Sequence, residues 1–358
     1  MTEQVSMRVA VVRGGRIVVE ERPIPEPGSG EVLVRTLACG ICGSDLHLFK
    51  HGASMMQLVE RLGGVPDNLT DGLVMGHEFV AQIVRFGADT PRRFAAGDRV
   101  CAVPFLQIDG APVSIGASSR TIGAYAEYFL LNESGLIRIP DRVPTAAAAL
   151  TEPLAIGVHA VAKGNVQPHD TAVVIGCGPI GLACIAVLKL RGVKRILAAD
   201  LSAKRRDLAR LFGADEVVDA REHSVFDGVG ATETAVIFEC VGAPGMIDQI
   251  VKRAPIGARV VVAGICSQED AFIPMLAVAK ELSFQFVSFY RADEFKAALA
   301  MLANDAIKWR EWITATVPLE LVAEAFEALQ RSDQHAKILI VPPGDALAGT
   351  GRPAALDS

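Results

Sequence analysis

Three separated segments of the chain carry side chains that can bind a metal ion. The first, residues 39–47, reads CGICGSDLH and contains Cys42; His77 and Glu78 lie together further on, and Glu152 follows much later. Thiolate, imidazole and carboxylate groups are all zinc ligands, and a catalytic zinc site uses three protein donors and leaves one position open. These residue types therefore predict a metal site assembled from distant parts of the chain.

The cysteine pair Cys39 and Cys42 allows three interpretations. A redox CxxC motif opens a helix directly after its strand, whereas here two further glycines and a serine intervene. A structural zinc knuckle needs a second CxxC or a pair of histidines, which the sequence does not offer. The favoured interpretation makes Cys42 one ligand of a metal whose other ligands lie far along the chain.

His77 and Glu78 are adjacent, and adjacent residues of an extended strand point to opposite faces. Unless the backbone turns there, only one of them binds a metal directly, and the other orients a ligand from behind. Each candidate also has a structural alternative. His77 taken alone could be a hydrogen-bonded core histidine, and Glu152 could be a helix cap. The set as a whole favours metal binding.

A second group of residues, from 171 to 200, has the order of parts expected of a nucleotide-binding unit. Residues 171–175 (TAVVI) are an apolar, β-branched run typical of a buried parallel strand. In the turn that follows, the first glycine permits a tight turn, the second lets a pyrophosphate approach the backbone, and the third lets a helix pack closely on the strand. Proline is tolerated in the first helical turn, and the amino end of the helix favours a phosphate. The predicted cofactor-binding residues in this turn are Gly176, Gly178, Pro179, Ile180 and Gly181.

Asp200 ends the next predicted strand, 195–199 (RILAA), and lies 19 residues after the last glycine of the turn. A carboxylate there can accept hydrogen bonds from a ribose diol, and its charge would repel a 2′-phosphate. Asp200 therefore favours NAD over NADP. Lys204, Arg205 and Arg206 follow it and keep NADP open as the second choice, since they could bind such a phosphate. Arg205 is counted among the predicted cofactor-binding residues, although a solvated helix face is the plainer interpretation of all three.

Length and composition limit the class of protein. At 358 residues the chain is too long for one compact core, so two domains are expected. Its net charge of −6 gives no support to nucleic acid or an anionic membrane as a partner. The first residues lack the pattern of a signal peptide, and no apolar run approaches the length of a membrane span. Seven scattered cysteines fit a reducing cytoplasm better than a disulfide framework.

The elements that must position these residues follow from the periodicity. Residues 7–38 and 121–139 predict short strands. Beyond residue 200, helices and strands alternate, which implies a parallel sheet covered on both faces. The loop between Cys42 and His77 spans 35 residues. Its apolar part, 53–64, predicts either a helix beside the substrate entrance or a surface excursion.

Five segments together resemble the zinc-dependent medium-chain dehydrogenase/reductase family, and most closely its polyol and threonine dehydrogenase branch. They read CGICGSDLH, GHEF, TEPLAIGVHA, VIGCGPIGL and HAKILIVP, and the resemblance extends over about residues 7–341. It implies an α/β protein with a Rossmann-type doubly wound parallel sheet at 156–304 and a mainly-β, GroES-like catalytic domain at 1–155 and 305–343. Residues 344–358 are expected to be a loose tail.

The resemblance also implies how the metal is held. Zinc would be bound by Cys42, His77 and Glu78, and Glu152 would bind it directly or through water. Glu152 stands where the alcohol dehydrogenases with a Cys₂His site place their second cysteine. Family members often carry a second, structural zinc on four closely spaced cysteines, of which this chain keeps only Cys101. One catalytic zinc per chain, and no structural zinc, is therefore expected.

The implied reaction is the reversible oxidation of an alcohol, with hydride passing to NAD. Zinc lowers the pKa of a bound water from about 15.7 to about 7, and a bound alcohol gains similarly. By resemblance, Ser44 takes the proton from the substrate oxygen and His47 passes it, through a ribose hydroxyl, to solvent. A helix N-cap is the structural role open to Ser44. Phe289 stands where the polyol branch places an arginine, which favours a secondary alcohol or small diol over a hexitol, with a polyol still open.

Two further expectations concern class and assembly. The alternative function is that of a zinc-free NADPH-dependent relative that reduces quinones or activated alkenes, or of a nucleotide-sensing binding protein. That lineage is expected to lack the cysteine, histidine and glutamate set, which this chain keeps. The resemblance also suggests a homodimer or homotetramer, with 282–289 (LSFQFVSF) as an edge strand that pairs between subunits.

Overall fold

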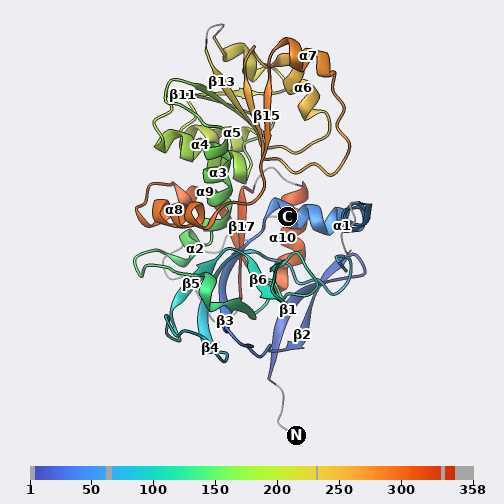
Figure 1. Cartoon of the computed structure of the whole chain (residues 1–358), viewed down its shortest axis with the longest axis vertical. Helices are drawn as coiled ribbons and strands as arrows, with labels where there is room; N and C mark the ends of the chain where they lie inside the picture. The colour runs from blue at the N-terminus through green and yellow to red at the C-terminus, as the bar shows by residue number, and fades with distance from the viewer. Residues whose placement is uncertain (1–4, 62–66, 231–232, 332–334, 343–358) are drawn as a thin grey trace. The chain divides into compact units, whose positions relative to one another are not determined.

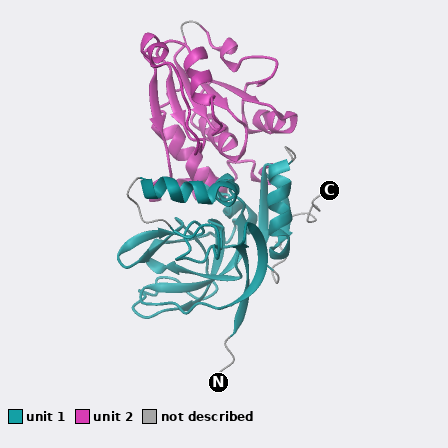
Figure 2. Cartoon of the chain, turned by 90° about the vertical axis from the view of Figure 1, so that its right-hand side faces the viewer, with its two compact units in different colours: residues 1–152, 313–358 teal, residues 153–312 magenta. Residues whose placement is uncertain are grey.

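The structure is a computed structural model that describes residues 5–61, 67–230, 233–331 and 335–342 (Figure 1). The chain forms two compact units. Unit 1 consists of residues 1–152 and 313–358, and unit 2 of residues 153–312 (Figure 2). The predicted tail, 344–358, lies outside the described residues.

Unit 1 is built on a mixed sheet of seven strands in the order β16-β17-β3-β4-β5-β9, with β8 also pairing with β3. All its neighbouring strands are antiparallel except β16 and β17. The strands of this sheet are β3 (Glu31–Gly40), β4 (Glu78–Phe86), β5 (Arg99–Ala102), β8 (Tyr128–Asn132), β9 (Leu136–Arg138), β16 (Ile313–Pro318) and β17 (Lys337–Val341). Unit 1 also contains two separate two-stranded hairpins. One pairs β1 (Ser6–Arg13) with β2 (Arg16–Pro23), and the other pairs β6 (Phe105–Ile108) with β7 (Ala111–Ser114). The strands expected in residues 7–38 and 121–139 are confirmed, whereas the β6–β7 hairpin was not predicted.

The helices of unit 1 are α1 (Gly43–Arg61), α2 (Thr145–Ala148) and α10 (Val322–Arg331), with 3₁₀ turns η1 (Glu133–Gly135) and η3 (Leu319–Leu321). Helix α1 buries Asp45, Leu48 and Gly52, whose spacing places them on one helical face. The helix expected within 53–64 forms as far as Arg61. It is the second half of α1, which starts next to Cys42, and is not a separate element.

Unit 2 is a six-stranded parallel sheet in the order β12-β11-β10-β13-β14-β15. Its strands are β10 (Thr171–Ile175), β11 (Arg195–Asp200), β12 (Glu216–Asp219), β13 (Ala235–Glu239), β14 (Arg259–Val262) and β15 (Ser283–Phe286). Its helices are α3 (Thr151–Lys163), which continues from unit 1, α4 (Pro179–Leu190), α5 (Ala203–Phe212), α6 (Met246–Arg253), α7 (Pro274–Ala279), α8 (Ala292–Ala303) and α9 (Trp309–Trp312), with the 3₁₀ turn η2 (Val225–Gly228). The predicted doubly wound parallel sheet is confirmed.

The two central strands of this sheet are mostly apolar, with Thr171 at the start of β10 and Glu239 at the end of β13 as the polar exceptions. All five residues of β10 and of β13 are buried. Val173 and Ile237 pack with Ile250 of α6 in one cluster. Their neighbours in the sequence point to the opposite face. The strand order reverses between β10 and β13, and such a switch point is where open parallel sheets bind ligands, outside the carboxyl ends of the strands.

Within the ranges that the structure describes, no helix is both long and apolar enough to cross a membrane.

Candidate metal and cofactor sites

The first half of the candidate metal site is the turn between β3 and α1. Cys42 lies in this turn, and Asp45 of the first helical turn closes it, because its Oδ2 accepts a hydrogen bond from Cys42 N at 3.1 Å. The same oxygen accepts a hydrogen bond from the Tyr125 hydroxyl at 2.7 Å. Ser44 N lies 3.5 Å from the Cys42 sulfur. A buried carboxylate therefore fixes the backbone that presents the Cys42 side chain.

His77 enters the same site from the residue before β4. Its Nδ1 lies 3.1 Å from Asp45 Oδ1, in an ion-pair contact that is not aligned as a hydrogen bond. Its Nε2 lies 3.3 Å from Ser44 Oγ. The residue before His77 is Gly76, which has a φ of +99°. A side chain does not fit there, because a Cβ on Gly76 would lie 2.6 Å from the Tyr125 ring. Ser44 and His77, which are 33 positions apart in the sequence, are thus in contact.

The chemistry of this pair fits a zinc ion. Burial lowers the pKa of His77, but the interactions with Asp45 and Cys42 outweigh burial and raise that pKa well above its usual value. Ser44 lies beside both members of the pair, because its N atom is 3.5 Å from the Cys42 sulfur and its Oγ is 3.3 Å from His77 Nε2. A histidine with a carboxylate on one ring nitrogen and a soft donor near the ring is the usual environment of a zinc ligand. The structure places both Cys42 and His77 next to Ser44, and metal binding by the two stays a prediction.

Glu78, the third predicted ligand, is held by a lysine. Lys337 Nζ of β17 lies 2.7 Å from each carboxylate oxygen of Glu78 and donates to Ile41 O at 2.9 Å. Both side chains are fully buried. Gly40 of β3 leaves the room for this carboxylate, because a Cβ at that position would lie 2.0 Å from Glu78 Oε2. Glu78 thus fits the role of a buried partner behind the metal ligands, and direct ligation by it stays a prediction.

Lys337 also connects Glu78 with two other predicted ligands. Burial lowers the pKa of Lys337, but the interactions with Glu78, Cys42 and Glu152 outweigh it, so the pKa is raised. All three therefore act on one ammonium group. Glu152 is buried at the start of α3. Within the described part of the chain, no group of three or more His, Cys, Asp or Glu side chains is close enough to hold an ion. Joint metal binding by the predicted ligands therefore stays a prediction.

Sequence reasoning missed Asp45, Tyr125 and Lys337. Lys337 had a readable signal, because a lysine that opens the apolar strand KILIV needs a buried counter-charge. Asp45 was interpreted only as the start of a helix. Cys39 points into the core of unit 1, where burial raises the pKa of its thiol well above the usual value, so it remains a thiol.

Ser44 and His47, the predicted proton carriers, lie in the first turns of α1. Burial lowers the pKa of His47, and the nearby His51 and Lys50 lower it further. The Nε2 atom of His47 is buried and has no hydrogen-bond partner among the residues described. The ring of His51 lies one helical turn away, with its centroid 4.8 Å from that of His47. The Ser44 hydroxyl already contacts His77.

The predicted cofactor turn connects β10 to α4. Gly176 has a φ of +90°, a conformation that glycine adopts without strain, and Pro179 is the first residue of α4. A Cβ on Gly181 would lie 1.9 Å from Gly176 O, so only glycine lets the helix approach the turn. A Cβ on Gly178 would meet nothing within 4 Å. The third glycine thus serves packing, and the second leaves space above the turn.

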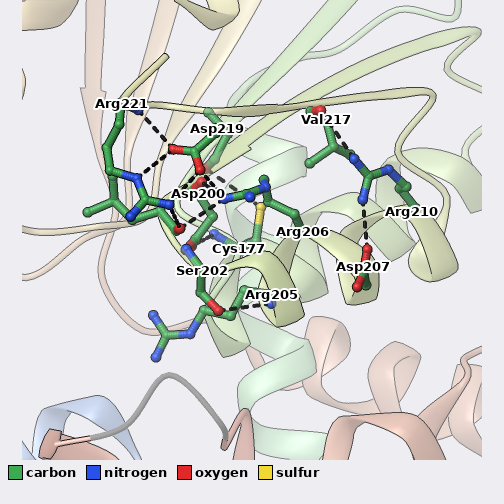
Figure 3. A network of polar contacts seen from close by, with 12 residues as sticks. Cys177, Asp200, Ser202, Arg205, Arg206, Asp207, Arg210, Val217, Asp219 and Arg221 are labelled. Atoms are coloured by element: carbon green, nitrogen blue, oxygen red, sulfur yellow. Dashed lines mark hydrogen bonds and ion pairs between the residues drawn. The ribbon is translucent and has the colours of Figure 1, made fainter. Parts of the chain in front are cut away.

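Asp200 lies at the carboxyl end of β11, next to this turn (Figure 3). Its Oδ2 accepts a hydrogen bond from Cys177 N at 2.7 Å, and its Oδ1 accepts one from Ser202 N at 2.8 Å. The carboxylate is therefore anchored to the backbone of the glycine turn and to the residue that caps α5. The structure therefore places Asp200 at the end of its strand beside the glycine turn, and ribose binding by it stays a prediction.

The neighbouring arginines have different surroundings. Arg206 Nη1 lies 2.9 Å from Asp219 and also donates to the carbonyl of Asp200, so it is part of the framework. Arg221 pairs with the same Asp219 and, as the largest cause, holds the pKa of that carboxyl well below its usual range. The Arg205 side chain points away from this network (Figure 3). Arg206 is therefore more than part of a solvated helix face, because it also pairs with Asp219.

Comparison with known proteins places this geometry in a family. Residues 28–141 match the alcohol dehydrogenase GroES-like domain, and residues 179–304 match the zinc-binding dehydrogenase domain. Sorbitol dehydrogenase of Homo sapiens is 30% identical over 346 residues, which cover 90% of this chain and 92% of that protein. The chain belongs to the zinc-binding alcohol dehydrogenase family. This confirms the resemblance, and with it the GroES-like and Rossmann-type domains and an oxidoreductase function.

Two other members of the zinc-binding alcohol dehydrogenase family extend the comparison. The (R,R)-butanediol dehydrogenase of Bacillus subtilis is 30% identical over 347 residues, covering 91% of this chain and 96% of that protein. A protein of Sinorhizobium meliloti, solved with bound NADP, is 26% identical with a TM-score of 0.81, covering 95% of this chain and 100% of that one. The relatives therefore support oxidoreduction of alcohols. The cofactor and substrate of this chain have to be inferred from its own residues.

Proposed function

We propose that this chain is a zinc-dependent dehydrogenase that reversibly oxidises a secondary alcohol or small diol with NAD. The observation that carries the proposal is that Ser44 contacts both Cys42 and His77, with its N atom 3.5 Å from the Cys42 sulfur and its Oγ 3.3 Å from His77 Nε2, while Asp45 lies 3.1 Å from the other ring nitrogen of His77. A soft donor and an imidazole oriented by a carboxylate form part of a zinc site, and a hydroxyl beside them can handle a proton.

Each residue has one role in this proposal. Cys42 and His77 hold one zinc ion per chain, and Glu78 or Glu152 completes its protein ligands. Zinc, when bound, lowers the pKa of the substrate hydroxyl. Ser44 accepts the proton that the hydroxyl loses, and His47 carries it away. Asp45 acts behind these groups, because it orients His77 and holds the turn that carries Cys42.

The preference for NAD rests on Asp200. Its carboxylate is fixed by two backbone N–H groups at the end of β11, where a ribose would lie, and a 2′-phosphate there would meet a negative charge. Arg206 is engaged by Asp219 and so is not available to neutralise that phosphate. The NADP bound to the Sinorhizobium meliloti relative makes this preference worth testing directly.

The preference for a small, weakly polar alcohol rests on the segment before α8. Phe289 is 56% exposed, and Arg291 pairs with Asp293 at 2.7 Å. Arg291, two residues after Phe289, is therefore already engaged by an acidic side chain. Relatives named sorbitol dehydrogenase and (R,R)-butanediol dehydrogenase make a polyol and a diol the two substrates to compare.

The decisive experiment is a panel of primary alcohols, secondary alcohols, butane-2,3-diol, sorbitol and threonine, each assayed with NAD and with NADP, together with metal analysis. We expect the diol with NAD to give the highest kcat/KM and one zinc per chain. Cys42→Ser should remove both zinc and activity, whereas Cys266→Ser, at an exposed thiol, should change neither. A fully active preparation without zinc would contradict the proposal and favour the quinone or alkene reductase alternative.

We also infer that the chain forms a homodimer or homotetramer through β15. This strand is the last of the parallel sheet, and Phe286 on it is 65% exposed. Helix α7 precedes it and has no buried residue, although Met275 and Val278 are large and apolar. An unpaired, apolar sheet edge is a site for pairing with another strand. Because all subunits present the same edge, two copies can pair around a two-fold axis.

A further inference from the structure

Helix α1 carries a polar stripe that starts at the candidate metal site and leads away from it. Ser44, His47 and His51 lie at positions i, i+3 and i+7 of the helix, so they share one face. The adjacent face, formed by Asp45, Leu48 and Gly52, is buried. Ser44 Oγ marks the inner end of the stripe, because it lies 3.3 Å from His77 Nε2.

The two histidines of the stripe are in contact with each other. Their ring centroids lie 4.8 Å apart and the ring planes are inclined by 45°. Both side chains are only partly exposed. His47 Nε2 is buried without a hydrogen-bond partner among the residues that the structure describes. A buried nitrogen of this kind is costly unless another molecule or a water satisfies it when the protein works.

The electrostatic surroundings of His47 favour passing a proton on. Burial lowers the pKa of His47, and the interactions with His51 and Lys50 lower it further. No acidic group of the described chain contributes to this shift. Two imidazoles this close disfavour double protonation, so a proton that reaches one of them is readily released to the other.

We propose that His51 takes over from His47 the proton released by alcohol oxidation and delivers it to solvent. The proposal rests on the proposed function, since it needs a reaction that releases a proton at Ser44. Each imidazole gains a proton at one ring nitrogen and loses one from the other, so one proton enters the stripe, one leaves it, and neither ring keeps a charge. His51 acts through His47 and is therefore a relay residue, not a catalytic one.

The test compares His51→Gln with the unmodified chain in the oxidation of butane-2,3-diol at saturating NAD, between about pH 6 and pH 9. General acid–base groups that touch the substrate contribute about 10²–10⁴-fold, so a relay one step removed should contribute less, roughly three- to tenfold in kcat. We expect this loss at low buffer concentration, its recovery on addition of free imidazole, and an unchanged KM for NAD. His223→Gln, at an exposed histidine of unit 2, is the matched control and should behave as the unmodified chain.

Three outcomes would overturn the proposal, and they separate it from the proposed function. An active His51→Gln variant whose kcat equals that of the unmodified chain at every buffer concentration leaves no role for His51. A lower kcat that imidazole does not restore points to a structural role. Either result leaves the dehydrogenase activity standing, whereas an unmodified chain that oxidises no alcohol of the panel with either cofactor removes both proposals.

Discussion

At the scale of single residues, the buried pair of Lys337 and Glu78 is the contact on which the candidate metal site depends most. The two residues are 259 positions apart in the sequence, and each carboxylate oxygen lies 2.7 Å from the ammonium. Removing one member of a buried ion pair leaves an uncompensated charge in a low-dielectric environment. Removing one member of the pair should therefore destabilise the fold and free the other from its present position.

We predict that Lys337→Met lowers the free energy of unfolding by about 3–5 kcal/mol. Denaturant unfolding with and without added zinc would measure this. The matched control is Lys252→Met, because Lys252 pairs with Asp248 on the exposed face of α6, and such a pair contributes about 0–1 kcal/mol. Equal effects of the two substitutions would contradict the role of burial.

A second prediction at this scale concerns Asp200. Asp200→Ser removes the charge that a 2′-phosphate would meet, and serine can still accept a hydrogen bond. We expect the ratio of kcat/KM for NAD to that for NADP to fall by about tenfold or more, which corresponds to about 1.4 kcal/mol. Steady-state kinetics with both cofactors measures the ratio. An unchanged ratio would show that the discrimination lies elsewhere.

The sequence was informative about residues that carry reactive atoms, and much less so about the residues that hold them. Cys42 and His77 were identified because few other functions need a thiol and an imidazole in such short glycine-containing segments. Asp45 and Tyr125 were not, because aspartate at a helix start and tyrosine in a strand region are common. Their importance follows from a contact at 2.7 Å between residues 80 positions apart, which no local pattern contains.

At the scale of elements, two glycines of the turn before α4 are expected to have different roles, Gly181 in packing and Gly178 in cofactor binding. Gly181→Ala would place a Cβ 1.9 Å from Gly176 O, so the helix must move and the protein should be destabilised. Gly178→Ala meets no atom within 4 Å and should fold normally. Because that open space is where a pyrophosphate approaches, we expect Gly178→Ala to bind NAD at least tenfold more weakly while its Tm stays within about 2 °C of the unmodified value.

Thermal unfolding and NAD titration of the two variants test this prediction together. If Gly178→Ala binds NAD normally, the cofactor does not approach the backbone at this turn. If Gly181→Ala is as stable as the unmodified chain, the close contact between the turn and α4 is not required.

Most elements of unit 2 were predictable because their apolar runs alternate regularly with helical periodicity, and a parallel sheet follows from that alternation. Unit 1 was less predictable. Strand β16 (ITATVP) is short, contains two threonines and ends in proline, and it pairs in parallel with β17. For helix α1, a helix was expected only within 53–64, since the glycines and histidines of its first half weaken the apolar periodicity.

At the scale of the whole molecule, the exposed apolar edge at β15 should decide the state of assembly. We predict that Phe286→Glu shifts the protein from a dimer or tetramer towards smaller species, because it places a charge on the edge that would be buried between copies. Leu190→Glu is the matched control, as Leu190 is an exposed apolar residue at the end of α4. Sedimentation equilibrium would distinguish the two. A monomeric unmodified chain, or identical assembly of both variants, would contradict the prediction.

The pairing of β17 with β3 has a consequence for biosynthesis. Ile340 lies opposite Cys39, and Lys337 belongs to the same strand, so unit 1 cannot complete its sheet or neutralise Glu78 until residues 337–341 have left the ribosome. The parallel sheet of residues 153–312 needs no such late segment. We therefore expect protease resistance to appear first in the middle of the nascent chain, and translation stalled before residue 337 to leave the first 150 residues susceptible to digestion.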